Sequence, residues 1–432
     1  MRTWKSQLLT VTSLASSGLG FLSQILLARL FGTSDAVNAY FFALGVPIFV
    51  GGLLSSAVNI SLTPSLRRQF RSGEAPDPLA ATRSSARRLA AAVVVVGWCC
   101  IPLQLASLPA HSPLRDVPAL VELLAGCWIF AGLLVHQSIA AAALVAQDRA
   151  LDAALLPLFP PLFALCTMLL GAQVLGILSL LGGQILGVAM SLAMTRARFG
   201  RARDAAITRV RSRTIAAGIS HGALAVACFT AYPFADSLLA PRIGPQAMAQ
   251  IAYAQRLVVG LGSLMVAAPF ALLATRFADL AHEGTRTEFR RVVRRSLAIS
   301  MLPAIALGFA FVAAGPLIVS GLLGHGRFSA EDVDNVGHAI RLMAPGMVLM
   351  LMTTLLFRAG FALPGCARRL AWVGASWIGS YLLLGSLLKP WGLAGLASAY
   401  SLTWVVCGAL TVLIIHQSSN SLPFDRHRPA AA

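Results

Sequence analysis

The sequence is poor in charged residues, and acidic ones are the scarcest. Only 12% of its 432 residues are charged, against about 25% in an average soluble domain. No G-x-x-x-x-G-K-[ST] phosphate-binding loop occurs, and no polar segment exceeds about 25 residues. These absences argue against ATP-driven transport by this chain alone, and they leave no room for the catalytic domain of a hydrolase or glycosyltransferase. Any transport would be driven by an ion gradient, the membrane potential or the substrate gradient.

Metal-ligating patterns are also lacking. The seven cysteines fall mostly within apolar runs, with no C-x-x-C pair and no histidine cluster at metal-ligand spacing. We interpret them as small apolar residues, and we expect no metal site and no cofactor.

Long apolar runs dominate what is present. Hydrophobic residues make up 57% of the chain, and the mean hydropathy is +0.76. A membrane-spanning helix needs about 20 largely apolar residues. The first run, 8–30, is too long for the apolar core of a signal peptide, so we interpret it as a retained span. The sequence predicts an all-α polytopic membrane protein with twelve spans, at 8–30, 37–63, 89–109, 118–146, 152–172, 174–195, 215–240, 246–274, 297–324, 335–362, 370–388 and 391–415.

The basic residues gather between particular spans. A net charge of +18 and a pI near 11.1 are also found in nucleic-acid-binding proteins, but here the arginines cluster in the loops after the second, sixth and eighth spans. Cytoplasmic loops carry such an excess. We therefore expect a multi-pass protein of the bacterial inner membrane with both termini in the cytoplasm. Its basic loops would contact anionic membrane lipids, and we expect no nucleic-acid partner.

Two passages indicate an internal repeat. "ARLFGTSDAVNAYFFAL", from Ala28, is similar to "APRIGPQAMAQIAYAQRL", from Ala240, and 213 residues separate Tyr40 from Tyr253. The chain then divides into an N-terminal six-helix lobe (1–200), a basic linker (201–214), a second six-helix lobe (215–416) and a cytoplasmic tail (417–432). Transporters built from two repeats bind substrate between them and rock to alternate access. A chance match in an apolar chain is the alternative.

A few polar residues interrupt the spans, where charge is costly and therefore usually faces a cavity or a partner. Arg256 and Arg341 lie inside the eighth and tenth spans. Arg29 is near the outer end of the first span and can extend to the membrane surface. Asp35 is placed to cap the second helix.

Asp236, near the outer end of the seventh span, is a candidate to bind a coupling cation or to pair with Arg256. An interfacial or capping role is the alternative. Gln24, Asn38 and Gln255 are uncharged groups suited to a hydrated cavity or to contacts between helices.

Four passages resemble the MurJ/MviN lipid-linked-precursor flippases, of the multidrug/oligosaccharidyl-lipid/polysaccharide exporter superfamily. In chain order they are "LGFLSQILLARLFGTSDAVNAYFFALGVP", "AQIAYAQRLVVGLGSL", "GPLIVSGLLGHGRFSAEDV" and "LLFRAGFAL". The resemblance implies two six-helix lobes around a cationic cavity that passes an undecaprenyl-pyrophosphate-linked glycan outward. Arginine suits this task because its planar guanidinium group can donate two parallel hydrogen bonds to the oxygens of a phosphate. Arg256 would be the principal phosphate ligand, and Arg29, Arg341, Gln255, Asn38 and Gln24 are further candidates.

The chain departs from the family pattern at several of these positions. Ser17-Gly18, Ser23-Gln24 and Gly51-Gly52 stand where the family usually carries arginines, and Gln255 stands where it carries Asp. The family's two additional C-terminal helices have no counterpart among the twelve predicted spans. These differences weaken the case for lipid II as the substrate, and they suit a divergent member that handles another lipid-linked glycan, such as an exopolysaccharide repeat unit.

Two other functions stay open. A cation-coupled drug exporter of the same superfamily needs an acidic residue deep in a lobe, for which only Asp236 and Glu122 are available. A non-transporting scaffold that binds polysaccharide synthesis proteins would explain the missing arginines.

Overall fold

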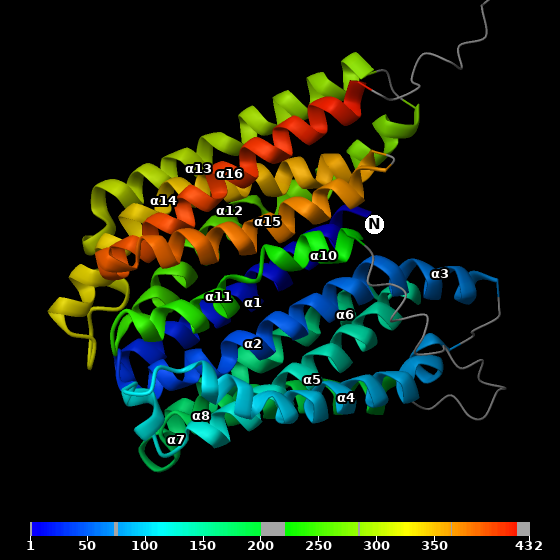
Figure 1. Ribbon diagram of the computed structural model, residues 1–432. Coiled ribbons are helices and arrows are strands. Elements are labelled where there is room, and N and C mark those ends of the chain that lie inside the picture. Colours follow the sequence, from blue (N-terminus) through cyan, green and yellow to red (C-terminus); the bar gives the residue numbers. More distant parts are fainter. Residues whose placement is uncertain (1, 73–76, 200–220, 284–285, 364, 421–432) are drawn as a thin grey trace, which may run out of the picture.

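The fold is a bundle of long helices. The computed structural model describes residues 2–72, 77–199, 221–283, 286–363 and 365–420, and these residues contain no strand. The helices of the first half, drawn in blue to green, pack mainly on one another, and those of the second half lie beside them (Figure 1). The first group comprises α1 (Arg2–Phe31), α2 (Asp35–Ala57), α3 (Thr63–Arg71), α4 (Pro78–Ser107), α5 (Leu120–Ala146), α6 (Ala150–Leu155), α7 (Phe159–Leu175) and α8 (Leu178–Phe199).

The second group begins after residue 220. It comprises α10 (His221–Cys228), α11 (Tyr232–Leu239), α12 (Ala247–Glu283), α13 (Arg286–Leu322), α14 (Ala330–Ala362), α15 (Cys366–Leu387) and α16 (Gly392–Asn420). Its closest packing joins α13 to α14 and α14 to α16, and α12 also packs on α14. The predicted linker 201–214 and most of the predicted tail 417–432 lie outside the described residues.

The prediction of an all-helical membrane protein is confirmed. Within the described part of the chain, ten helical segments are long and apolar enough to cross a membrane. Each coincides with one of the twelve predicted spans. The eighth predicted span lies on α12, and the seventh differs from its prediction.

The seventh predicted span, 215–240, is not one continuous helix where it is described. It consists of α10 and α11, with non-helical residues 229–231 between them. Pro233 lies in the first turn of α11. It has no N–H to donate and its ring would clash with the carbonyl four residues earlier, at Phe229, so the helix breaks there. The break lets α11 pack closely on α2, where Gly45 faces the Pro233 carbonyl.

Several arginines predicted to lie in loops lie on helices instead. Arg67, Arg68 and Arg71 are on α3, and Arg290, Arg291, Arg294 and Arg295 are in the first turns of α13. Arginine has a high helix propensity, so a polar segment that is rich in it can extend a spanning helix beyond the membrane. We call the end of the bundle that carries these residues the basic end. It lies on the right in Figure 1.

A π-helical turn, Val58–Leu62, joins α2 to α3 without a break in the chain's helical course. Pro64 is the second residue of α3 and cannot donate a backbone hydrogen bond. The π-helical turn widens the helix just before the position of this lost bond. The predicted span 37–63 thus ends near a real change in helix geometry.

Candidate functional site

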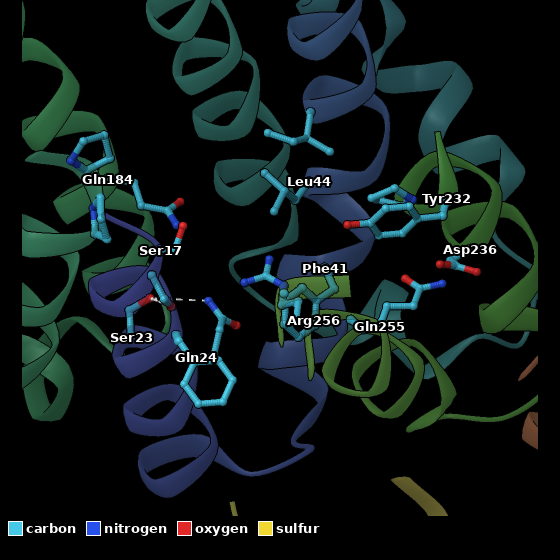
Figure 2. A pocket seen from close by; sticks show the side chains of 18 of the residues that line it. Ser17, Ser23, Gln24, Phe41, Leu44, Gln184, Tyr232, Asp236, Gln255 and Arg256 are labelled. Carbon is cyan, nitrogen blue, oxygen red and sulfur yellow. Dashed lines mark hydrogen bonds between the residues drawn. The ribbon is translucent and has the colours of Figure 1, made fainter. Parts of the chain in front are cut away.

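A central cavity of about 450 Å³ lies between the two groups of helices. Helices α1, α2, α7 and α8 form one side, and α11 and α12 form the other (Figure 2). The volume is typical of sites for small molecules or for the headgroup of a larger one. Its polar lining consists of Ser17, Ser23, Gln24, Gln184, Tyr232, Asp236, Gln255 and Arg256.

Arg256 is the one cationic residue among the described residues that line this cavity. It lies on α12 and is half-buried, and its guanidinium carbon is 4.8 Å from the centroid of the Phe41 ring on α2. An arginine over an aromatic face is held by a cation–π interaction, which orients the N–H donors of its planar fork. Figure 2 shows the guanidinium pointing into the cavity. This arrangement can bind an anion.

Asp236 lies in the cavity wall but is 1% exposed. The Tyr381 hydroxyl donates a hydrogen bond of 2.6 Å to its Oδ1. Its Oδ2 and the Nε2 of the neighbouring Gln255 are buried without a hydrogen-bond partner among the described residues. The predicted ion pair with Arg256 is absent from the described part of the chain, and the Arg256 guanidinium points away from Asp236 (Figure 2). The two charges therefore act separately.

The other predicted binding residues divide between the cavity and the surface. Gln24 and Gln255 line the cavity, and Gln24 Oε1 is buried without a partner within the described residues. Arg29 is exposed in the last turn of α1, and Arg341 is exposed on α14, where its side chain lies beside Gly315 of α13. Neither of these two arginines is among the cavity residues.

Asn38 lies at the end of the bundle opposite the basic end, away from the cavity lining. It is fully buried, and its Oδ1 accepts a hydrogen bond of 2.8 Å from the backbone N–H of Ala249. Its Nδ2 donates to the carbonyls of Thr33 and Ser34. The N-cap residue of α2 is Ser34, without a side-chain capping bond, and Asp35 is the exposed first residue of the helix. The negative charge of Asp35 thus interacts favourably with the positive end of the helix dipole, and its side chain makes no capping hydrogen bond there.

A set of hydrogen bonds closes this opposite end between the two groups. Asp332 Oδ1 on α14 accepts bonds from Thr33 Oγ1 at 2.8 Å and from Gln250 Nε2 at 3.1 Å. The Tyr253 hydroxyl donates to the Gly32 carbonyl at 3.0 Å, and the Arg327 N–H donates to the Arg29 carbonyl at 3.0 Å. Gly32 has a φ of +58°, which favours glycine. These bonds join the two groups of helices at this end, and we interpret them as a seal of the cavity.

Sequence reasoning overlooked Ser17, Ser23 and Tyr232 as cavity groups and Asp332 as a link between the two halves. Hydroxyl side chains in apolar helices usually bond to their own backbone, as Ser23 does to Gly20, so their spacing carries little signal. Asp332 had a readable local signal. Ser329 and Asp332 form a capping box at the start of α14, which the S-x-x-D spacing predicts.

Comparisons with known proteins agree with this architecture. A family model described as "Lipid II flippase MurJ" matches residues 27–427. The structure is similar to a lipid II flippase MurJ in an inward closed conformation, with a TM-score of 0.77 and 16% identity over 96% of this chain and 88% of that one. No curated protein gives a significant match.

Two transporters of the wider superfamily are also similar in fold. An inward-facing multidrug resistance transporter of the MATE family has a TM-score of 0.75 and 13% identity, covering 95% of this chain and 99% of that one. A MOP superfamily transporter from Pyrococcus furiosus has a TM-score of 0.66 and 15% identity, covering 96% and 95%. At these identities the likeness establishes the fold.

Proposed function

Because the chain belongs to the lipid II flippase MurJ family, we propose that it moves a lipid-linked glycan across the membrane and that Arg256 binds the phosphate groups of that lipid. It is a membrane transporter, and not an enzyme. The observation that supports the role of Arg256 is its place as the one cation among the described lining residues of a cavity between the two halves. A pyrophosphate is the part of the substrate that such a cation recognises.

The chemistry of the cavity suits a pyrophosphate headgroup. The Arg256 fork, steadied by Phe41, can donate two parallel hydrogen bonds to phosphate oxygens. The amides of Gln24 and Gln255, which line the cavity, offer further bonds to sugar hydroxyls or phosphate oxygens. The polyprenyl tail would stay in the lipid while the headgroup crosses between the two halves.

The transport cycle follows from the seal at one end. We propose that the basic end faces the cytoplasm, because arginine-rich segments remain on that side of a membrane. The hydrogen bonds around Asp332 and Asn38 would then close the outer side while the headgroup enters from inside. Release outside needs these bonds to break and the two halves to rock, as in other transporters with two similar halves.

Substrate identity within this class is the next question. Lipid II and an exopolysaccharide repeat unit share the pyrophosphate that Arg256 would bind, so both are compatible with this site. Partners among polysaccharide synthesis proteins belong to the same proposal. We place the protein in the bacterial inner membrane, where both substrates are made.

Cation-coupled drug export is a second candidate because of Asp236. Its carboxylate is buried in the cavity wall, whereas Glu122 is exposed in the first turn of α5. A buried acidic residue beside the cavity is what a cation-coupled mechanism requires. The family match favours glycan flipping, and Asp236 would then serve as the site that couples flipping to a cation.

Reconstitution into lipid vesicles tests the proposal. The protein should accelerate the transfer of a fluorescent lipid-linked pyrophosphate disaccharide from the outer to the inner leaflet, relative to protein-free vesicles. Extrusion of a cationic dye without lipid transfer would identify a drug exporter. Absence of both activities, with the protein shown to be inserted and folded, would leave the scaffold function.

A further inference from the structure

A second cavity, lined in part by basic residues, lies at the basic end, within the first group of helices. It has a volume of about 210 Å³ and is formed by α4, α5 and α8. Arg83 and Arg87 come from α4, His136 from α5 and Arg196 from α8, and we call these four residues and the space between them the arginine pocket. The arginine pocket shares no lining residue with the central cavity. It is therefore a separate site.

The positive charge of this pocket is not balanced by the described residues. No Asp or Glu is among its described lining residues, and none of its three arginines makes an ion pair within the described part of the chain. Carboxylates are available nearby: Arg67 pairs with Asp148 at 2.8 Å, and Arg198 pairs with Asp152 at 3.6 Å. Nearby arginines are thus paired with carboxylates, whereas the three pocket arginines are not, within the described residues.

Such an arrangement costs stability unless an anion offsets it. Arg83 and Arg87 are four residues apart on one helix, where like charges repel. Arg196 approaches them from a different helix, α8, across the cavity. Three arginines that line one space can bind the oxygens of a phosphate through charge-assisted hydrogen bonds. Arg83 is half-buried while Arg87 and Arg196 are exposed, so the pocket is open to an incoming headgroup.

The remaining walls indicate what kind of phosphate fits. The pocket also has apolar lining residues, namely Leu79, Ile139 and Leu192. Its lining further includes two buried threonines, Thr82 and Thr195. A free phosphate ion gains nothing from apolar walls, whereas a phospholipid places glycerol and acyl carbons against them. Farther along α4, Val95 and Val96 are exposed, which is expected of a helix that faces lipid. We propose that the arginine pocket binds the phosphate headgroup of an anionic membrane phospholipid.

The test compares two triple variants of the full-length protein. R83Q/R87Q/R196Q removes the charges of the pocket. R68Q/R71Q/R88Q removes the same charge from exposed arginines at the same end that do not line it. Binding of phosphatidylglycerol and of phosphatidylethanolamine is measured by native mass spectrometry of the purified protein. Inorganic phosphate and glycerol phosphate are added as soluble competitors.

The wild type should retain phosphatidylglycerol in preference to phosphatidylethanolamine, and the pocket variant should lose at least about 100-fold in affinity, as the loss of three charge-assisted contacts implies. The control variant should keep its affinity within about threefold of wild type. Equal loss in both variants, or no preference for the anionic lipid, would overturn the proposal. Full displacement by inorganic phosphate at equal concentration would show a soluble phosphate site instead of a lipid site.

Folding is checked separately. The thermal midpoints of both variants are measured in zwitterionic detergent without anionic lipid. If the triple pocket variant does not fold, the single variant R83Q replaces it, with an expected loss of about tenfold. Added phosphatidylglycerol should raise the midpoint of the wild type and of R68Q/R71Q/R88Q, because a ligand of the native state stabilises it. An equal rise in the pocket variant would contradict the assignment.

Discussion

Arg256 is the residue whose replacement tests the central cavity most sharply. Arg256→Ala removes the cation–π contact with Phe41 at 4.8 Å, worth about 0.5–2 kcal/mol, although this contact also exists without ligand. The larger effect falls on the bound state, since each hydrogen bond to a charged group contributes about 1.5–3 kcal/mol. Loss of a bidentate pair of hydrogen bonds should weaken pyrophosphate binding by about 3 kcal/mol, or roughly 100-fold, because water can replace part of the hydrogen bonding to the phosphate.

The assay is equilibrium binding of a short-chain polyprenyl pyrophosphate to purified protein in detergent. Arg256→Lys keeps the charge but loses the fork, so its affinity should fall by about tenfold, between wild type and Arg256→Ala. The matched control is Arg242→Ala, because Arg242 is exposed and outside the cavity lining. The reasoning is refuted if Arg256→Ala binds within about threefold of wild type, or if Arg242→Ala loses as much.

Three further predictions concern packing, the seal and the buried carboxylate. Gly45→Ala places a methyl group against the Pro233 carbonyl, so the free energy of unfolding should fall by about 1–3 kcal/mol and the thermal midpoint should fall with it. Gly260→Ala is the control, because its methyl group meets open space and should change the midpoint little. Thr33→Val removes a 2.8 Å hydrogen bond to Asp332 and should weaken the seal. A cysteine placed at Ala252, in the cavity lining, should then react faster with a maleimide added from the side opposite the basic end. An unchanged labelling rate would contradict the assigned seal. Tyr381→Phe removes the 2.6 Å bond to Asp236 and should lower the free energy of unfolding by about 1 kcal/mol, measured by denaturant titration; no change would show that the carboxylate finds another donor.

The positions of the spans could be predicted because the membrane imposes them. An apolar run of about 20 residues is the direct requirement of the hydrocarbon core, so ten predicted spans coincide with helical segments of the described chain. The broken seventh span shows the limit of that rule. Proline is tolerated in membrane helices, so Pro233 alone does not say whether the helix bends or breaks.

The candidate site was harder to predict, because sequence indicates the depth of a residue in the membrane better than the direction of its side chain. Arg256 and Arg341 both lie inside predicted spans, yet Arg256 faces the cavity and Arg341 is exposed beside α13. The direction depends on how each helix is rotated against its neighbours, which the pattern of an almost wholly apolar helix does not reveal. The sequence places Asp236 near a helix end, but it does not show that packing buries this carboxylate and brings Tyr381 of α15 to it.

The resemblance and the residues contributed different information. The resemblance gave the family, which the match over residues 27–427 supports. Ser17 and Ser23, which stand where the resemblance implies arginines, line a cavity whose described lining contains a single cation. A divergent site of this kind makes direct measurement of transport more informative than further comparison.

Translocation in vesicles is the measurement that tests the account most directly. Wild-type protein and Arg256→Gln are reconstituted at equal density, and the initial rate at which a lipid-linked pyrophosphate disaccharide leaves the outer leaflet is followed by quenching of its fluorophore. The account predicts a wild-type rate well above that of protein-free vesicles and a reduction of about 100-fold in the variant. Equal rates for the two proteins, or a wild-type rate no faster than that of protein-free vesicles, would contradict it.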